Sequence, residues 1–371
     1  MRLQALGRLA PAVFVLLIVS PGTVRACSCV SLSNGCKMAL NPGDVVFLAK
    51  AISKVEVREF ATDGDSKGIA TGYAIHLTTT ENFQGAAQPG QEIVVSTGQG
   101  NGDCGVPFIV GTSYLVHAST YNGQLTTNIC AGTVPEVMVG GTLKELRALR
   151  DGGRVDDVFG TVAIAPDGVG FEDLAQTRPL SNVPVHVTGS SGATFSAMTD
   201  EHGAYSFASL PRDIYRFEQD LPPGLSTWQS TDAKPPTVEV DDKGGTGAGC
   251  QVDVFSRPDG QISGTVIDGN GQGVSGFVTI EPADPIEAQA AFRRGGLPGC
   301  EMDDGNFSLP HLAPGRYRLI FYAKIGNNIN LRHPFYWPPA NDVPNSTAIE
   351  LGFGQHIDNV RIEVSATAIA R

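Results

Sequence analysis

The residues with the clearest chemical potential are Cys27-Ser28-Cys29, which lie where a secretion signal would be cut. Cleavage after Ala26 makes Cys27 the first residue of the mature chain and gives it a free α-amine. An α-amine has a pKa of about 7.7–8.0, so it can lose its proton at modest cost near neutral pH. The amine and the carbonyl oxygen of Cys27 then lie close together, and a cluster of this kind can hold a metal ion.

The first 26 residues carry the three parts of a cleavable signal. These parts are a positive start (Arg2 and Arg8), an apolar run at residues 12–19, and small residues at Val24 and Ala26. Two alternatives remain open. Lipidation of Cys27 is disfavoured because Arg25 lies where lipoprotein signals carry an apolar or small residue. An uncleaved anchor is disfavoured because the apolar run is too short to span a bilayer. We therefore expect a secreted, periplasmic or cell-surface protein.

Composition excludes several classes of function. The formal net charge is −12, and removing residues 1–26, which hold three arginines and no acid, makes it −15. A surface of that sign repels nucleic acid and anionic lipid, and solubility is its simplest explanation. Seven cysteines in an exported chain indicate disulfides rather than a thiolate metal site, and the odd number leaves at least one unpaired. No later apolar run is long enough to span a membrane.

Strands and one helix follow the cysteines. Runs rich in Val, Ile, Tyr and Thr predict strands at residues 44–57, 71–80, 92–96 and 113–119. Further on, Thr142 and Glu145 have the spacing of a capping box at the start of a helix. Leu143, Leu146 and Leu149 share one face of that helix, and Asp151-Gly152-Gly153 ends it. We place the first domain boundary there.

The rest of the chain repeats itself. Gly160-Thr-Val recurs as Gly264-Thr-Val, and the interval from Gly203 to Tyr215 equals that from Gly305 to Tyr317. Short strands separated by turn residues about every ten positions indicate β-sandwiches. We predict two copies of one β unit.

The first domain resembles the inhibitory domain of the tissue inhibitors of metalloproteinases, a netrin-like module on an OB-fold barrel. The resemblance rests on the Cys-Ser-Cys start, the strand-like run from Asp44, Cys104-Gly-Val and Ile129-Cys130, and it covers about residues 27–140. It implies the disulfides Cys27–Cys104 and Cys29–Cys130. Cys36 departs from the family pattern, because this chain has no cysteine just beyond Ile129-Cys130. A free thiol, a different partner within the chain and a link between two molecules are therefore all open for Cys36.

The same resemblance implies a mode of inhibition. In that family the amine and carbonyl oxygen of the first residue chelate the catalytic zinc of the target protease, and the second side chain enters its specificity pocket. Catalytic zinc sites keep a position open for water, so such a ligand fits the chemistry. Cys27 and Ser28 would take these roles. The alternative is that the motif only staples the first strand of the barrel.

The two repeats, at about 154–255 and 256–364, resemble carboxypeptidase-regulatory-like domains, which are small transthyretin-like sandwiches. The resemblance implies structural rather than catalytic roles for their motifs. Cys250 and Cys300 lie in different repeats, and a bridge between them is one hypothesis.

No catalytic pattern is evident. The histidines are scattered, and neither His-Glu-x-x-His nor Gly-x-Ser-x-Gly occurs. Asp200, Asp303 and Asp304 suggest calcium, but turns explain them better, because too few oxygen ligands cluster there. The aromatic run Phe335-Tyr336-Trp337 could stack on sugar or peptide, although core packing explains it more simply.

We predict an all-β protein with a signal peptide (1–26), an OB-fold-like barrel with a short C-terminal helix (27–150) and two transthyretin-like sandwiches (151–255 and 256–371). The expected function is non-enzymatic protein binding outside the cytoplasm, with a zinc metalloprotease or another extracellular protein as partner. No cofactor, intrinsic metal or nucleic acid is expected. The alternative is an extracellular structural or glycan-binding protein with its site near Trp337.

Overall fold

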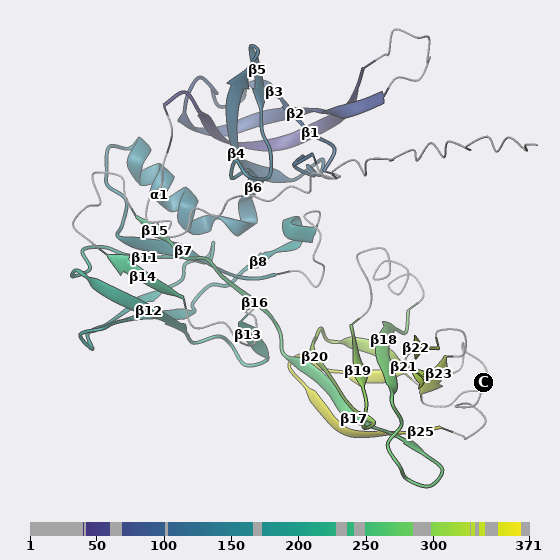
Figure 1. The fold of residues 1–371 in the computed structure, drawn as a ribbon. Coiled ribbons are helices and arrows are strands. Elements are labelled where there is room, and N and C mark those ends of the chain that lie inside the picture. Colours follow the sequence, from purple (N-terminus) through teal and green to yellow (C-terminus); the bar gives the residue numbers. More distant parts are fainter. Residues whose placement is uncertain are drawn as a thin grey trace, which may run out of the picture.

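The computed structural model describes residues 40, 42–59, 69–100, 103–165, 173–227, 236–240, 249–284, 298–326, 328–330, 334–337 and 348–364. Over these residues the chain is nearly all β, as the sequence predicts. Three β units follow one another, and a single α-helix lies between the first and the second (Figure 1).

The first unit is a small closed barrel. Its strands are β1 (Val45–Glu59), β2 (Ile69–Gln84), β3 (Glu92–Thr97), β4 (Ser113–Tyr121), β5 (Gln124–Thr126) and β6 (Val134–Pro135). They pair in the order β1-β2-β3-β5-β4-β6, and β1 also pairs with β4, which closes the sheet. Alternation along β3 directs Ile93 and Val95 inward, where they pack with Phe47, Ile75 and Leu77.

Helix α1 (Gly140–Arg150) follows a short 3₁₀ turn, η1 (Glu136–Met138). Leu143 and Leu146 are buried against the outside of the barrel, as the sequence predicts. The predicted capping box is wrong. The N-cap is Val139, which offers no capping side chain, and the Thr142 hydroxyl oxygen is buried within the helix without a hydrogen-bond partner among the described residues.

The second unit is a β-sandwich. One sheet has the order β10-β9-β12-β14, and the other has β11-β7-β16-β13, with β8 and β15 also pairing with β7. The bounds are β7 (Val158–Ile164), η2 (Asp173–Gln176), β8 (Arg178–Pro179), β9 (Pro184–Gly189), β10 (Thr194–Met198), β11 (Ala204–Phe207), β12 (Asp213–Gln219), β13 (Leu225–Thr227), β14 (Thr237–Val240), β15 (Cys250–Gln251) and β16 (Val254–Pro258).

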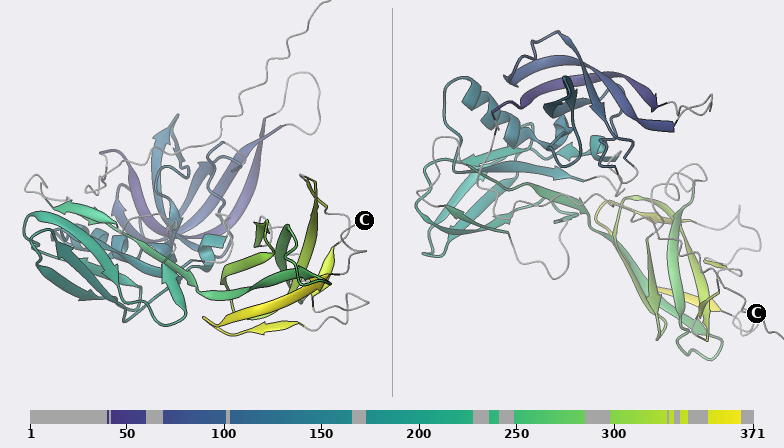
Figure 2. Two further views of the ribbon diagram at one scale, coloured as in Figure 1. Left: turned by 60° about the horizontal axis from the view of Figure 1, so that its bottom comes forward. Right: turned by 45° about the horizontal axis from the view of Figure 1, so that its top comes forward.

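The third unit is a second β-sandwich, with one sheet in the order β20-β17-β25 and the other built on β19-β18-β21, where β22, β23 and β24 also pair with β21. The bounds are β17 (Gly260–Asp268), β18 (Gly276–Pro282), β19 (Gly299–Met302), β20 (Asn306–Leu312), β21 (Gly315–Ile325), β22 (Asn328–Ile329), β23 (Phe335–Trp337), β24 (Ile349–Leu351) and β25 (His356–Val364). Only Asp259 separates β16 from β17, so one nearly continuous strand joins the two sandwiches (Figures 1 and 2).

The sequence repeat corresponds to a structural repeat. Gly203 and Gly305 both have positive φ, 70° and 83°. The carbonyl oxygen of each accepts a hydrogen bond from the strand beside it, from the Val162 N–H and the Val266 N–H respectively. The hydroxyl of Tyr215 donates to the Pro211 carbonyl oxygen at 2.7 Å. The hydroxyl of Tyr317 likewise donates to the Ala313 carbonyl oxygen at 2.8 Å. The equal spacing in the two copies therefore gives each sandwich one glycine turn and one hydrogen bond from a tyrosine hydroxyl.

Candidate functional site

The predicted site residues Cys27, Ser28 and Cys29, together with Cys36, lie outside the described residues. The structure does describe the two cysteines that the resemblance pairs with the motif. Cys104 and Cys130 are both disulfide-bonded. Their surroundings define the candidate site, which we call the disulfide end of the barrel.

A loop between β3 and β4 presents Cys104. The Asp103 carboxylate accepts backbone N–H groups of Gln99, Gly100 and Gly105 at 2.5, 2.7 and 3.2 Å. Burial opposes ionisation of Asp103, but these donors together hold its pKa below the ordinary value. A side chain at Gly105 would collide with the Gly98 backbone, so the loop closes tightly on itself. Sequence reasoning missed Asp103, although the surrounding glycine-rich run (Gly98-Gln-Gly-Asn-Gly-Asp) was a signal.

Cys130 reaches the same end of the barrel from the other side. The Ile129 N–H donates to the Cys104 carbonyl oxygen at 2.9 Å, and the Cys130 N–H donates to the Asn128 side chain at 2.9 Å. Ile129 and Val106 pack on the barrel core, which fixes both segments. The two disulfide-bonded residues therefore lie on hydrogen-bonded neighbouring segments. A Cys-x-Cys motif needs such a pair, because residues two apart in an extended strand are separated by only about 7 Å.

The hypothesis of a bridge between Cys250 and Cys300 is wrong. Cys300 is a free thiol on β19, and burial raises its pKa. Cys250 is disulfide-bonded and lies in the core of the first sandwich, 3 % exposed. Its partner is therefore a different cysteine. The two residues belong to separate cores, because Cys300 packs on the core of the second sandwich.

Helix α1 fixes the barrel to the first sandwich. On the barrel side, Glu81 of β2 accepts Arg147 at 2.6 Å and Arg150 at 3.0 Å. The hydrogen bond from Arg147 is the main reason that the pKa of Glu81 is lowered. On the sandwich side, the Gly141 N–H donates to the Thr161 hydroxyl at 3.1 Å, and a Cβ at Gly141 would overlap the Gly160 backbone. The sequence did not reveal these contacts, because the partners lie far apart along the chain.

The middle of α1 is hydrogen-bonded to the segment that leads into the sandwich. The Glu145 carboxylate, 2 % exposed, accepts the Asp156 N–H at 2.8 Å, and burial raises the pKa of Glu145. Glu145 therefore accepts a hydrogen bond from the segment that follows the helix, and it does not cap the start of the helix.

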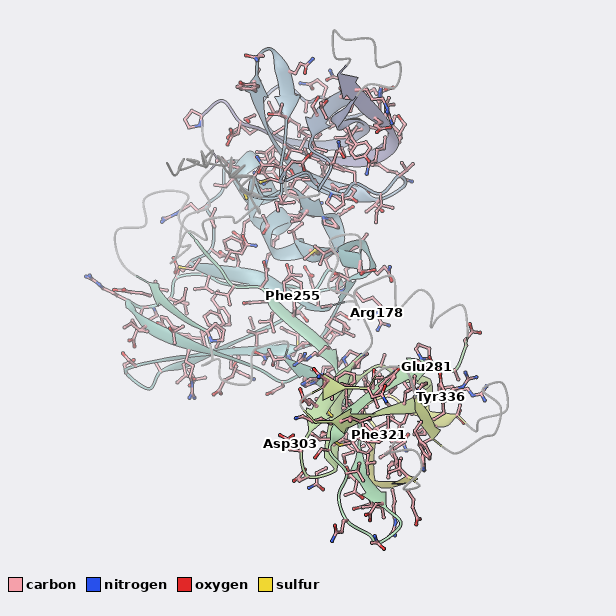
Figure 3. The ribbon with its side chains drawn as sticks, turned by 45° about the vertical axis from the view of Figure 1, so that its right-hand side comes forward. Arg178, Phe255, Glu281, Asp303, Phe321 and Tyr336 are labelled. Carbon is pink, nitrogen blue, oxygen red and sulfur yellow. The ribbon has the colours of Figure 1, made fainter. Side chains whose placement is uncertain are left out.

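The aromatic run of the second sandwich is divided between two faces of β23. Phe335 and Trp337 pack against the core, as the simpler sequence interpretation predicts. By strand alternation Tyr336 lies on the opposite face. Burial raises the pKa of Tyr322, and Tyr336 and Glu281, which are labelled close together in Figure 3, raise it further. Trp337 is therefore partly buried, and the part of its ring that packs on the core is not available for stacking on a ligand.

No group of three or more His, Cys, Asp or Glu side chains that could hold a metal ion occurs in the described part of the chain. Among these same residues no helix is long and apolar enough to cross a membrane. Asp200 and Asp304 each accept backbone N–H groups within their turns, which accounts for them structurally.

Comparisons with known proteins give only distant similarities. No protein family matches the chain, and no curated protein is similar in sequence. Among solved structures, the minor pilin GBS52 of Streptococcus agalactiae is 12 % identical, with 56 % of this chain and 94 % of that chain covered and a TM-score of 0.21. The Bacillus anthracis TIE protein is 13 % identical, with 87 % and 48 % covered and a TM-score of 0.24. The shaft pilin spaA of Lactobacillus rhamnosus GG is 12 % identical, with 57 % and 96 % covered and a TM-score of 0.21. Scores this low do not carry a functional argument.

Proposed function

We propose that the chain is an exported, non-enzymatic protein in which two sandwiches carry a disulfide-bonded barrel that binds another extracellular protein. The observation that carries the proposal is the pair of disulfide-bonded cysteines, Cys104 and Cys130, on neighbouring segments at one end of the barrel. Structural disulfides persist mainly in oxidising compartments, which supports export. The contacts of α1 with Glu81 and Thr161 support a barrel held in one orientation on its carrier.

The finer fold assignments belong to the same proposal. Closure of the order β1-β2-β3-β5-β4 through β1 and β4 supports an OB-fold-like barrel, which is a five-stranded closed or partly open sheet. The shared strand order of the two sandwiches, each with a parallel pair at β7–β16 or β17–β25, supports two carboxypeptidase-regulatory-like domains.

Counting thiols in the exported protein tests this proposal. Alkylation of the native chain should label Cys300 alone, whereas all seven cysteines should be labelled after reduction under denaturing conditions. The intact mass of the same sample should show a chain that begins at Cys27 without lipid. Labelling of Cys104 and Cys130 in freshly isolated protein would contradict export into an oxidising compartment and remove the basis of the proposal.

Inhibition of a zinc metalloprotease is a second, more specific candidate. It is favoured by the neighbouring positions of Cys104 and Cys130, because bridges to Cys27 and Cys29 would hold the new N-terminus rigidly and lower the ordering cost of binding. The test compares mature protein with a variant that retains Ala26, against a panel of zinc endopeptidases. Inhibition should be lost with Ala26, because the Cys27 amine becomes an amide. Equal inhibition by both proteins would refute zinc chelation.

A further inference from the structure

Cys250 raises a question of pairing that the sequence alone leaves open. It is disulfide-bonded, and its partner is not Cys300, which is free. A disulfide requires Cα atoms within about 7 Å of each other. Cys250 packs in the core of the first sandwich with Val158 and Tyr205. Cys104 is two residues before Val106, and Cys130 follows Ile129. Val106 and Ile129 both pack in the core of the barrel, which is separate from that of the sandwich. The remaining cysteines of the chain are Cys27, Cys29 and Cys36.

The geometry points to a disulfide between the N-terminal segment and the first sandwich, formed by Cys36 and Cys250. The link from Cys250 to an N-terminal cysteine follows from the separate cores. Its assignment to Cys36 rests on the proposed pairing of Cys27 and Cys29 with Cys104 and Cys130. With that pairing, Cys36 is the one cysteine left, and all bonded cysteines are accounted for.

The described contacts place Leu40, four residues after Cys36, on the side of α1 that faces the barrel. Leu40 packs on the cluster of Leu143 and Leu146, against α1. Four residues of chain span at most about 14 Å, which is the longest reach that the chain allows between Leu40 and position 36. Only the width of the helix, about 10 Å with side chains, separates this cluster from the sandwich.

On the far side of the helix two hydrogen bonds connect α1 with the segment of Cys250. The Glu145 carboxylate of α1 accepts the Asp156 N–H at 2.8 Å, and the backbone carbonyl oxygen of the next residue, Asp157, accepts the Cys250 N–H at 2.8 Å. β15 pairs with β7, and β7 packs against α1 (Figure 1). A bond between the N-terminal segment and Cys250 would therefore be a second connection between the two units that α1 already joins. It would attach the N-terminal segment to the sandwich through Cys36. Together with the proposed bonds of Cys27 and Cys29 to the barrel, it would cross-link the barrel and the first sandwich through that segment.

Formation of the bond is an oxidation. The two thiols lose two protons and two electrons, and a protein disulfide donor of the exported compartment accepts the electrons by thiol–disulfide exchange and is itself reduced to a dithiol. With Cys250 only 3 % exposed, the finished bond is shielded from external thiols.

Peptide mapping without reduction tests the inference on the native chain. Cleavage after Lys and Arg leaves Cys27, Cys29 and Cys36 together in peptide 26–37, or 27–37 after signal removal. It leaves Cys104 with Cys130 in peptide 68–144, and Cys250 in peptide 244–293, because Arg257 precedes a proline. We expect one species that contains all three peptides. Recovery of 244–293 without the N-terminal peptide would overturn the inference.

Variants then assign the cysteine. In Cys36→Ser, peptide 244–293 should be released with an alkylated Cys250, while the N-terminal peptide stays bonded to 68–144. Cys300→Ser is the matched control and should leave the three-peptide species intact. If Cys36→Ser leaves 244–293 attached, Cys27 or Cys29 is the partner, which refutes the assignment to Cys36 and the proposed pairing at the disulfide end together. Recovery of 27–37 bonded to 244–293 but not to 68–144 would leave the bond to the sandwich, but it would refute the proposed pairing and with it the basis for the assignment to Cys36.

Discussion

Replacing Gly141 with alanine tests whether α1 is seated as closely on the first sandwich as the structure shows. The new Cβ would lie 2.5 Å from the carbonyl carbon and 2.8 Å from the Cα of Gly160. Ordinary carbon–carbon contacts are about 3.5–4.0 Å, so the helix would have to move by roughly 1 Å. Such overpacking costs about 1–3 kcal/mol. Displacement would also lengthen the bond from the Gly141 N–H to Thr161, and a bond of this kind contributes about 1 kcal/mol.

One effect opposes this loss. Alanine is intrinsically favoured over glycine in a helix by about 1 kcal/mol. The expected net destabilisation is therefore about 1–3 kcal/mol, which corresponds to about 5- to 150-fold in an opening equilibrium. Amide hydrogen exchange over α1 and β7 measures this opening locally, which matters because a chain of three units need not unfold in one step.

Gly269→Ala is the matched control, because a Cβ at that position meets nothing within 4 Å. Its exchange pattern should equal that of the natural chain. If Gly141→Ala protected α1 as well as or better than the natural sequence, the close seating of the helix would be wrong, and helix propensity alone would govern the site.

Three other predictions follow from single contacts. Tyr215→Phe and Tyr317→Phe each remove one hydrogen bond, and the two bonds are equivalent in the two sandwiches. Each variant should therefore lower the stability of its own sandwich by a similar amount, about 1 kcal/mol, in urea titrations followed by hydrogen exchange. A large difference between the two losses would argue against the equivalence of the two bonds. Asp103→Asn keeps the size of the side chain but weakens its bonds to backbone N–H groups, and it should speed reduction of the Cys104 disulfide by dithiothreitol relative to Asp151→Asn, an exposed control. Burial lowers the pKa of His117. As the pH falls through about 6.5, the unfolded chain therefore binds more protons than the folded chain, and the stability of the barrel should fall between pH 7 and pH 5. The variant His117→Gln should show a weaker dependence of stability on pH, and an unchanged slope would refute this role of His117.

The sequence was informative wherever one local pattern decides the structure. Alternation in residues such as Ile93 and Val95 predicts a half-buried strand, and the equal spacing of Gly203–Tyr215 and Gly305–Tyr317 predicts the repeat. It failed where a distant partner decides. Thr142 and Glu145 have the spacing of a capping box, but the first turn of α1 receives its acceptor from Thr161, and Glu145 serves Asp156. Cys250 and Cys300 likewise look like partners only until their separate cores are known.

The start of α1 shows how the barrel and the first sandwich are held to each other. A helix leaves its first N–H groups without internal acceptors, and a buried N–H without an acceptor costs about 1–3 kcal/mol. Here Val139 provides no cap, and the Thr161 hydroxyl of the neighbouring sandwich accepts from Gly141. The helix buries Leu143 and Leu146 against the barrel. Its apolar face therefore packs on the barrel, and its N-terminal N–H group is hydrogen-bonded to the sandwich. A helix completed in this way transmits the orientation of one unit to the other, because neither unit satisfies it alone.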